Sequence, residues 1–318
     1  ESAQGVVGLL SDSDQTDLSL PHLSPLLFEG PKVAGAPFRS TVPSLELFTS
    51  GTTGERRAVI KNLTQIGEEI KTLEKVFGER LGGSVIFSTV SHQHIYGLLF
   101  RVLWPLCVGR PFHIKTPLFW EDLFAEWPPS LDATLVSSPT HLERIPSLPL
   151  GHRIKGIFSS GGKLKELVAL RVGDLLGQTP IEVFGSTETG GVGWRQQSRD
   201  PDSLLWRPLP GVHVSGGCPL AVHSPFTGLP EASHAEEKGR SETTGLGDFG
   251  TVFPDGRFRV EGRIDRIVKV AEKRLSLDDM EQRLGRHVFV NKSTALLLDS
   301  TEDNGRRSIG IVVQLSDS

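Results

Sequence analysis

The sequence contains little cysteine and has no excess of positive charge. Only Cys107 and Cys218 occur among 318 residues, far apart and without C-x-x-C spacing. This argues against a disulfide framework and against a zinc site, and it makes a reducing, cytoplasmic compartment the expected one. The formal net charge of -4 gives no basic footprint for nucleic acid and no polybasic face for a membrane surface, so neither partner is expected.

Long hydrophobic runs are also missing. The longest one, residues 96–109, is interrupted by Arg101 and Pro105. A helix that spans a bilayer requires about 20 predominantly apolar residues, so we expect no membrane insertion. No segment has the pattern of a secretory signal peptide. The first residue is Glu1 and strand-like runs lie close to both ends, so we interpret the sequence as a fragment.

The chain does contain an alternation of helix-like and strand-like segments between residues 64 and 184. Apolar residues recur at helical spacing over residues 64–81, behind a potential Thr64 cap, and over residues 164–176. Further helices are predicted at residues 98–106, ending near Pro105, and at residues 120–127. Short apolar runs predict strands at residues 84–89, 112–114, 133–136, 154–158 and 181–184. Strands that alternate with helices predict an α/β fold with a largely parallel sheet.

After Gly185 the pattern changes to short β-like pieces separated by glycine and proline. They lie at residues 212–214, 220–223, 251–253 and 258–260. Asp255-Gly256 between the last two is a strong hairpin signal. A strand at 267–270 and a helix at 277–284 begin a further unit. We therefore expect a large domain over residues 1–262, with a β-rich subdomain at about 205–262, and a partial domain over residues 263–318.

The first segment with chemical potential is a run of hydroxyl and glycine residues. It comprises Thr49, Ser50, Gly51, Thr52, Thr53 and Gly54, and Arg56 and Arg57 close it with positive charge. Glycines let backbone N–H groups converge on one point, and hydroxyls add donors, which suits a polyphosphate. The spacing is not that of a G-x-x-x-x-G-K-[ST] loop. A phosphate cradle is one interpretation, and a surface turn rich in Gly, Ser and Thr is the other.

The second segment follows the strand predicted at 181–184. It consists of Phe184, Gly185, Ser186, Thr187 and Glu188. Ligands bind at the carboxyl ends of strands in open α/β sheets. There an aromatic ring can stack on a base, hydroxyls can contact phosphate, and a glutamate can coordinate magnesium. The alternative is an ordinary helix N-terminus, with Ser and Thr caps and a glutamate matched to the helix dipole.

The third segment joins Leu246-Gly247-Asp248 to residues 262–269. A carboxylate in a glycine turn suits a ribose, because it can accept both hydroxyl protons. Residues 245–250 also match the dinucleotide pattern G-x-G-x-x-G, but a charged loop precedes them rather than a strand, so we reject a Rossmann site. For Arg263 and Asp265, the alternative is a local salt bridge with little functional meaning.

Together these segments resemble the ordered signature motifs of the adenylate-forming superfamily, which includes acyl-CoA and aryl-CoA synthetases, peptide-synthetase adenylation domains and luciferases. The run from Thr49 to Arg57 resembles the phosphate loop T-S-G-T-T-G-x-P-K. Residues 184–188 resemble aromatic-G-S-T-E, 246–248 resemble T-G-D, and 262–274 resemble the hinge motif G-R-x-D-x-x-I-K-x-x-G-x-R. His94 lies in the family's acyl-site motif, and Ser160-Gly161-Gly162 resembles its adenine-side turn. The resemblance spans residues 41–280, and it is closest to compact ligases of fatty-acid-like and aryl-polyene pathways.

Several positions depart from the family pattern. Arg56-Arg57 replaces Pro-Lys, but Arg57 keeps the charge and adds a bidentate fork for phosphate. Leu246 replaces the usual threonine. Glu272 replaces a glycine that lets the pantetheine arm of CoA pass close to the backbone, which favours a carrier protein as acceptor. The family's late catalytic lysine has no counterpart before Ser318, and the region before the phosphate loop is short, as expected of a fragment.

The resemblance implies activation of a fatty, hydroxy or aryl carboxylic acid by ATP and Mg2+, with pyrophosphate release. Thr49 to Gly54 and Arg57 would hold the leaving phosphates, Thr187 the α-phosphate and Glu188 the magnesium ion. Phe184, with Gly185 and Ser186 in the same motif, and the turn Ser160-Gly161-Gly162 would flank adenine, while Asp248 and Arg263 would bind the ribose. His94 would lie beside the acyl pocket. The alternatives for His94 are a buried, hydrogen-bonded core histidine or, with His92, a metal pair without a third ligand.

The resemblance also implies a second step, in which the acyl group passes to the thiol of CoA or of the phosphopantetheine of an acyl carrier protein. A C-terminal domain would swing between the steps about a hinge at Asp265. Two alternatives remain open. One is a nucleotide-binding remnant that has lost activity, and the other is a use of acyl-adenylates other than thioester formation.

Overall fold

The computed structural model describes residues 9–10, 22–23, 44–50, 56–147, 152–230, 243–270, 273–298 and 308–316. The chain divides into two units, residues 1–42 and residues 43–318. In the first, β1 (Leu9–Leu10) and β2 (His22–Leu23) pair in parallel. All elements below belong to the second unit. Among the described residues, no helix combines the length and the apolar character needed to cross a membrane.

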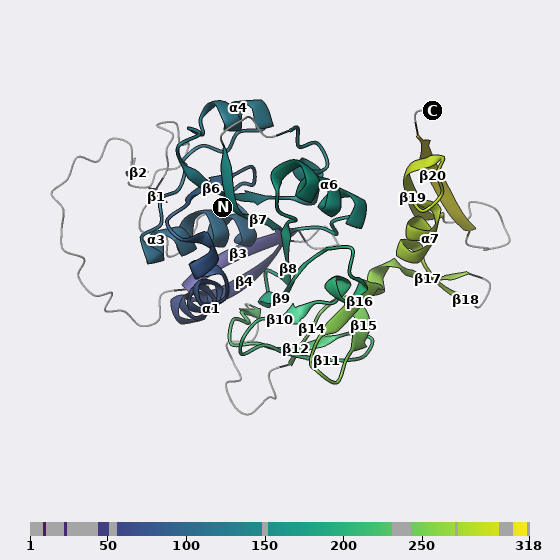
Figure 1. Cartoon of the computed structure of the whole chain (residues 1–318). Coiled ribbons are helices and arrows are strands. Elements are labelled where there is room, and N and C mark those ends of the chain that lie inside the picture. Colours follow the sequence, from purple (N-terminus) through teal and green to yellow (C-terminus); the bar gives the residue numbers. More distant parts are fainter. Residues whose placement is uncertain are drawn as a thin grey trace, which may run out of the picture. The chain divides into compact units, whose positions relative to one another are not determined.

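A six-stranded sheet forms the centre of the second unit, in the order β10-β9-β8-β7-β6-β5 (Figure 1). Four strands run parallel: β5 (Val85–Ser88), β6 (Asp132–Ser137), β7 (Arg153–Ser159) and β8 (Ile181–Ser186). β9 (Gly190–Gln196) and β10 (Arg207–Pro208) continue the sheet in antiparallel pairing. The predicted α/β fold with a largely parallel sheet is therefore confirmed.

Helices cover both faces of this sheet because neighbouring strand residues point in opposite directions. Ile86 and Phe158 join a core with α1 (Leu63–Leu81), whereas Phe87 and Ile157 join a second core with α4 (Trp120–Ala125) and α6 (Glu166–Leu176). The short α5 (Pro139–Leu142) follows β6. The parallel strands are thus buried on both faces, as their continuous apolar runs predict.

The cap of α1 differs from the prediction. Thr64 lies inside the helix, and Asn62 is the capping residue. The Asn62 Oδ1 atom accepts from the Gln65 backbone N–H at 2.8 Å, and the Gln65 side chain accepts from the Asn62 N–H at 2.9 Å. Asn62 also keeps the extended backbone that a cap requires, with φ −82° and ψ 160°.

The helix predicted at residues 98–106 is part of a longer helical run, which begins at Ile95 and ends at Val108. α2 (Ile95–Gly97) passes into a π-helical segment, η1 (Leu98–Leu103), and then into α3 (Trp104–Val108). The change from π to α hydrogen bonding restarts the helix at Trp104, so Pro105 occupies a first-turn position where its missing N–H is tolerated. The C-cap is Gly109, whose φ of 71° is left-handed. The strand predicted at residues 112–114 is reduced to one parallel bridge, between Ile86 and Phe112.

Small β elements surround this sheet. β3 (Ser44–Ser50), β4 (Arg56–Asn62) and β13 (Leu229–Pro230) form one sheet, and β11 (His213–Ser215), β12 (Ala221–His223) and β14 (Thr243–Gly245) form another. The hairpin of β15 (Asp248–Val252) and β16 (Phe258–Arg263) turns at the predicted Asp255-Gly256, with φ +83° at the glycine. A 3-10 turn, η2 (Pro201–Leu204), precedes β10.

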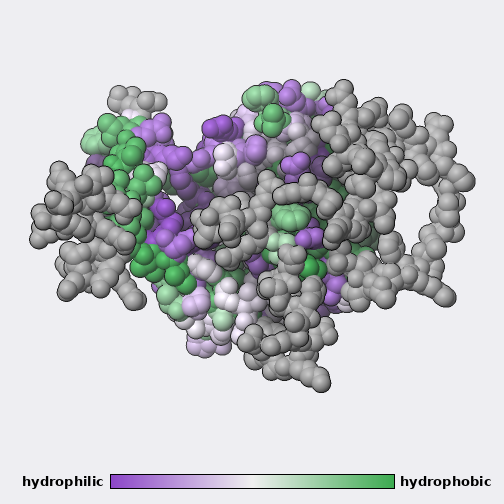
Figure 2. Space-filling view, turned by 180° about the vertical axis from the view of Figure 1, so that it is seen from behind, coloured by the Kyte–Doolittle hydropathy of each residue, from purple (hydrophilic) through white to green (hydrophobic). Residues whose placement is uncertain are grey.

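The remaining elements follow a 3-10 turn, η4 (Ile264–Arg266). They are β17 (Ile267–Val270), β18 (Lys273–Ser276), α7 (Leu277–Leu284), β19 (Val290–Leu298) and β20 (Ser308–Leu315). The strand and helix predicted here are confirmed, whereas a domain boundary at residue 263 stays a prediction. Exposed apolar side chains gather on β19 and β20 (green in Figure 2), among them Leu296, Leu298, Val312 and Leu315.

Candidate active site

Two of the predicted segments meet at the carboxyl ends of β7 and β8. The two strands pair in parallel, with Ser159 opposite Glu182. The turn Ser160-Gly161-Gly162 leaves β7 at this edge, and Gly161 takes a left-handed φ of 81°. The Ser160 hydroxyl donates to the carbonyl of Val183 at 2.8 Å. The Ser160-Gly161-Gly162 turn is therefore bonded directly to the strand that carries Phe184.

The segment after Phe184 is a β-hairpin and not a helix N-terminus, so the capping alternative is wrong. β8 extends through Ser186 and returns as β9 from Gly190. The Ser186 N–H donates to the Thr189 hydroxyl at 3.1 Å, and the Thr189 N–H donates to the Ser186 hydroxyl at 3.2 Å. These bonds close the turn, and they place Thr187 and Glu188 at its tip.

Glu188 is half-buried at this tip. Its carbonyl accepts from the Gly228 N–H at 2.7 Å. Among the described residues, none donates a hydrogen bond to its carboxylate. Magnesium in nucleotide sites is commonly bound by one or two carboxylates together with phosphates and water. A carboxylate that accepts no hydrogen bond from the described residues fits that role, and the described part of the chain has no cluster of three or more His, Cys, Asp or Glu side chains that could hold a metal alone.

Two buried charged residues that were not predicted interact with the hairpin or lie near it. Glu69 of α1 accepts from the Gly191 N–H at 2.7 Å, and Lys61 of β4 donates to the carbonyl of Phe226 at 2.5 Å. Burial raises the pKa of Glu69 and lowers the pKa of Lys61. The charges of Glu69 and Glu188 oppose the lowered pKa of Lys61. The buried cation therefore interacts electrostatically with the carboxylate at the hairpin tip.

Phe184 is half-buried and packs against other aromatic rings. Its ring centroid lies 5.3 Å from that of Trp206 and 5.9 Å from that of Phe258. Backbone hydrogen bonds join Trp206 and Phe258 in both directions, at 2.8 and 3.0 Å. One side of the Phe184 ring is thus held by the protein, and stacking of adenine on it stays a prediction.

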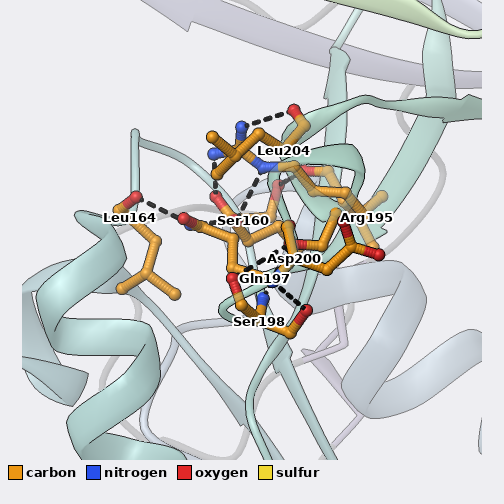
Figure 3. A network of polar contacts seen from close by, with 10 residues as sticks. Ser160, Leu164, Arg195, Gln197, Ser198, Asp200 and Leu204 are labelled. Carbon is orange, nitrogen blue, oxygen red and sulfur yellow. Dashed lines mark hydrogen bonds and ion pairs between the residues drawn. The ribbon is translucent and has the colours of Figure 1, made fainter.

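A buried polar network joins Glu182, Arg195 and Gln197 near the Ser160 turn; Ser160, Arg195 and Gln197 are labelled in Figure 3. Arg195 forms a bidentate pair with Glu182 at 2.8 and 3.0 Å. Gln197 donates from Nε2 to Glu182 at 2.5 Å and to the carbonyl of Leu164 at 3.0 Å. We did not predict these residues, although charged and amide side chains inside apolar strands are a signal of such a network.

Asp248 and Arg263 face each other across β15 and β16. Burial raises the pKa of Asp248; the charge of Arg263 opposes this shift, and Asp265 and Asp278 add to it. Arg263 forms a bidentate pair with Asp265 at 2.9 and 2.8 Å, which is the local salt bridge of the alternative interpretation. Ribose binding by Asp248 and Arg263 and a hinge at Asp265 remain predictions.

His94 is exposed at the start of α2, so the alternative of a buried core histidine is wrong. His92 is exposed as well. In the segment predicted to bind phosphate, the backbones of Thr49 and Arg57 pair across β3 and β4. The side chains of Thr49, Ser50 and Arg57 lie outside the described residues, as do Gly51, Thr52, Thr53, Gly54 and Glu272.

Comparisons with known proteins agree with the predicted superfamily. A model of the family of AMP-binding enzymes matches residues 7–219. A 4-chlorobenzoate–CoA ligase of Arthrobacter sp is 24% identical and covers 94% of this chain, which spans 63% of that relative. A 4-coumarate–CoA ligase of Cereibacter sphaeroides is 26% identical, and the match covers 83% of this chain and 57% of that protein. The chain thus spans about 60% of the length of these relatives.

Solved structures share the fold. ATP-bound MatB from Rhodopseudomonas palustris aligns with a TM-score of 0.69 at 17% identity, over 84% of this chain and 57% of that chain. A variant of MenE from E. coli aligns with a TM-score of 0.75 at 16% identity, over 98% and 68%. The amide bond synthetase McbA from Marinactinospora thermotolerans aligns with a TM-score of 0.73 at 17% identity, over 94% and 66%. Because the family model covers more than half of the sequence, the chain belongs to the family of AMP-binding enzymes.

Proposed function

We propose that the protein activates a carboxylic acid with ATP to give an acyl-adenylate and pyrophosphate, and then transfers the acyl group to a thiol. The observation that carries the proposal is the junction of the Ser160 turn and the Glu188 hairpin at the carboxyl ends of β7 and β8. Ligands of open α/β sheets bind at this kind of edge. The CoA ligases among the relatives support the same chemistry.

In the first step, a carboxylate oxygen of the acid attacks the α-phosphorus of ATP. The bond to the bridging oxygen breaks, and pyrophosphate leaves with the electron pair. Both reactants are anionic, so catalysis requires alignment and charge neutralisation more than a base. Thr187 contacts the α-phosphate, and Arg57 with residues Thr49 to Gly54 holds the leaving phosphates. Glu188 would hold the magnesium ion, which would neutralise phosphate charge.

The remaining residues position the substrates. Phe184 and the Ser160-Gly161-Gly162 turn flank adenine, Asp248 and Arg263 bind the ribose, and His94 borders the acyl pocket. In the second step, the thiol sulfur attacks the acyl carbonyl, the thiol proton is lost and AMP leaves. Rotation about Asp265 would separate the two steps. The names of the relatives favour CoA as acceptor, whereas Glu272 in place of glycine favours a carrier protein.

We also propose a cytoplasmic location, which the free thiols of Cys107 and Cys218 support. A second candidate function is amide formation from the same adenylate, which the fold similarity to an amide bond synthetase keeps open. Transfer of a radiolabelled acyl group to CoA, to a carrier protein or to an amine distinguishes these acceptors.

Acid-dependent exchange between ATP and pyrophosphate tests the first step. A full-length version of the protein should catalyse exchange with at least one acid in a panel of aliphatic, hydroxy and aromatic acids. Glu188→Gln should reduce exchange by at least about 100-fold, because a neutral amide is a weak magnesium ligand. Unchanged exchange in this variant would remove Glu188 from the magnesium role. A protein that binds AMP but never exchanges pyrophosphate would instead be a nucleotide-binding remnant.

A further inference from the structure

A single buried carboxylate lies between the two structures proposed to flank adenine. We infer that Glu182 is a positioning residue, which fixes Phe184 through Arg195 and the Ser160-Gly161-Gly162 turn through Gln197. The inference rests on the proposed function, since it takes these two elements as the walls of an adenine site. It concerns only their placement, because Glu182 itself is enclosed by protein groups.

The first connection leads from Glu182 to Phe184. Both oxygens of Glu182 accept from Arg195, at 2.8 and 3.0 Å, so the guanidinium plane has a fixed orientation. This plane lies over Trp206, with the Arg195 Cζ atom 4.4 Å from the ring centroid. The ring of Trp206 in turn packs against that of Phe184, with 5.3 Å between the ring centroids. A shift of the ion pair would therefore move the surface on which the Phe184 ring rests.

The second connection leads from Glu182 to the glycine turn. Gln197 donates to Glu182 and to the carbonyl of Leu164, at 2.5 and 3.0 Å. Leu164 follows Gly162 by two residues and is buried, so this bond anchors the end of the turn. At its beginning, Ser160 is bound to Val183, the neighbour of Glu182 in β8. Figure 3 labels Ser160, Leu164 and Gln197 and draws the bond from Gln197 to Leu164.

Stability alone gives a weak reason for this arrangement. The side chains of Glu182 and Arg195 are only 3% and 11% exposed. Desolvation of such a pair offsets most of its attraction, and apolar residues of similar volume are often at least as stabilising. A buried ionic network does, however, fix the relative geometry of the groups it joins. Here the joined groups are the two proposed adenine walls.

The chain contains a matched cluster elsewhere. We name Glu182, Arg195 and Trp206 the nucleotide-side cluster, and Glu74, Arg110 and Trp104 the helix-side cluster. In the latter, Arg110 pairs with both oxygens of Glu74 at 3.2 Å and lies 5.5 Å from the Trp104 centroid. It joins α1 to α3 and the carbonyl of Gly82. The same chemistry is therefore present where no adenine wall is proposed.

The test compares ATP dependence of pyrophosphate exchange in variants of the two clusters. Glu182→Gln should raise KM for ATP by about tenfold, while KM for the acid changes little. Glu74→Gln should leave both constants at the wild-type values. Trp206→Phe should restore most of the ATP affinity lost in Trp206→Leu, because it keeps an aromatic surface under Arg195. Circular dichroism and thermal unfolding establish that each variant is folded at the assay temperature.

A double variant guards against loss of folding. Glu182→Leu with Arg195→Met removes both charges and leaves no unpaired ion in the interior. It should fold and still show the raised KM for ATP. An unchanged KM in this folded variant, or an equal rise in Glu74→Gln, would overturn the inference while the proposed function stands. Absence of both exchange and AMP binding in the wild-type protein would overturn the proposed function itself, and the inference with it.

Discussion

The nucleotide-side and helix-side clusters are built from the same three residue types, but they differ in access to solvent. Glu182 is 3% exposed and Glu74 is 37% exposed, whereas both arginines are largely buried. The third donor to the carboxylate also differs. Trp104 itself donates to Glu74 at 2.8 Å, whereas Gln197 donates to Glu182 and leaves the Trp206 ring to contact Phe184.

The difference in exposure gives the two Glu–Arg ion pairs different roles. A carboxylate that water can reach keeps its hydration when its partner is lost, so the pair is replaceable. A carboxylate enclosed by protein depends on every donor around it, and it transmits displacement to the groups it touches. Glu182 is connected to Phe184 through Arg195 and Trp206, and to the end of the Ser160 turn through Gln197. Glu74 joins helices that pack by their apolar faces as well.

The largest expected effect in this comparison is on stability. Glu182→Leu leaves Arg195 without its partner in the interior and should lower the free energy of unfolding by about 3–5 kcal/mol. Glu74→Leu also leaves the buried Arg110 without its carboxylate, but water can reach this site, so it should cost less, about 1–3 kcal/mol. Urea unfolding followed by circular dichroism measures both values. Equal losses would show that exposure of the carboxylate does not govern the cost.

Two glycines of the site differ in the same way, because Gly190 is closely surrounded by other residues and Gly161 is not. Gly190 and Gly161 both have a left-handed φ, of 69° and 81°. A Cβ atom at Gly190 would lie 2.7 Å from Glu69 Oε2 and 2.9 Å from Phe226 Cβ, whereas none of these contacts exists at Gly161. Gly190→Ala should therefore cost about 2–3 kcal/mol and Gly161→Ala about 1 kcal/mol.

The two alanine variants are compared by thermal unfolding, with exchange activity as a second measurement. Because Gly190 adjoins the buried Glu69, its variant should also displace the hairpin that carries Glu188 and reduce exchange. If Gly161→Ala proves the more destabilising of the two, crowding by Glu69 and Phe226 is not the controlling factor.

Local sequence patterns were sufficient for most of the fold. The period of apolar residues in α1, the apolar runs of β5 to β8 and the Asp255-Gly256 turn depend on neighbours within a few residues. The cap of α1 was predicted wrongly, because the neighbouring Asn62 and not Thr64 makes the capping hydrogen bond.

The site was predictable only in its motifs. Phe184 to Glu188 and Ser160 to Gly162 stand out by composition, and parallel pairing of β7 and β8 brings them together. The supporting contacts join residues far apart in sequence. Glu69 and Gly191 are 122 positions apart, and Gln197 and Leu164 are 33 apart. The spacing of residues along the sequence does not predict such pairs, because the residues come close together only when the sheet and the helices have packed.

The smallest expected effect concerns a third acidic residue, Asp248, whose burial should change the pH dependence of AMP binding. It is half-buried beside Arg263, and its raised pKa means that the folded protein holds this proton more tightly than the unfolded chain does. Ribose binding as an acceptor requires the ionised carboxylate. As pH falls through the raised pKa, AMP affinity should therefore decrease, by about twofold when the pH equals that pKa.

Stability should respond to Asp248 in the opposite sense. A raised pKa favours folding below the unfolded pKa, and this contribution is lost as pH rises through the folded value. Acidification should therefore weaken AMP binding while the contribution of Asp248 to stability increases. Calorimetric titrations from neutral pH downward measure the affinity, and Asp248→Asn should bind AMP more weakly and without this acidic limb. If the asparagine variant shows the same decrease in AMP affinity at low pH, another group causes the decrease. Asp248 would then not be a carboxylate on which nucleotide binding depends.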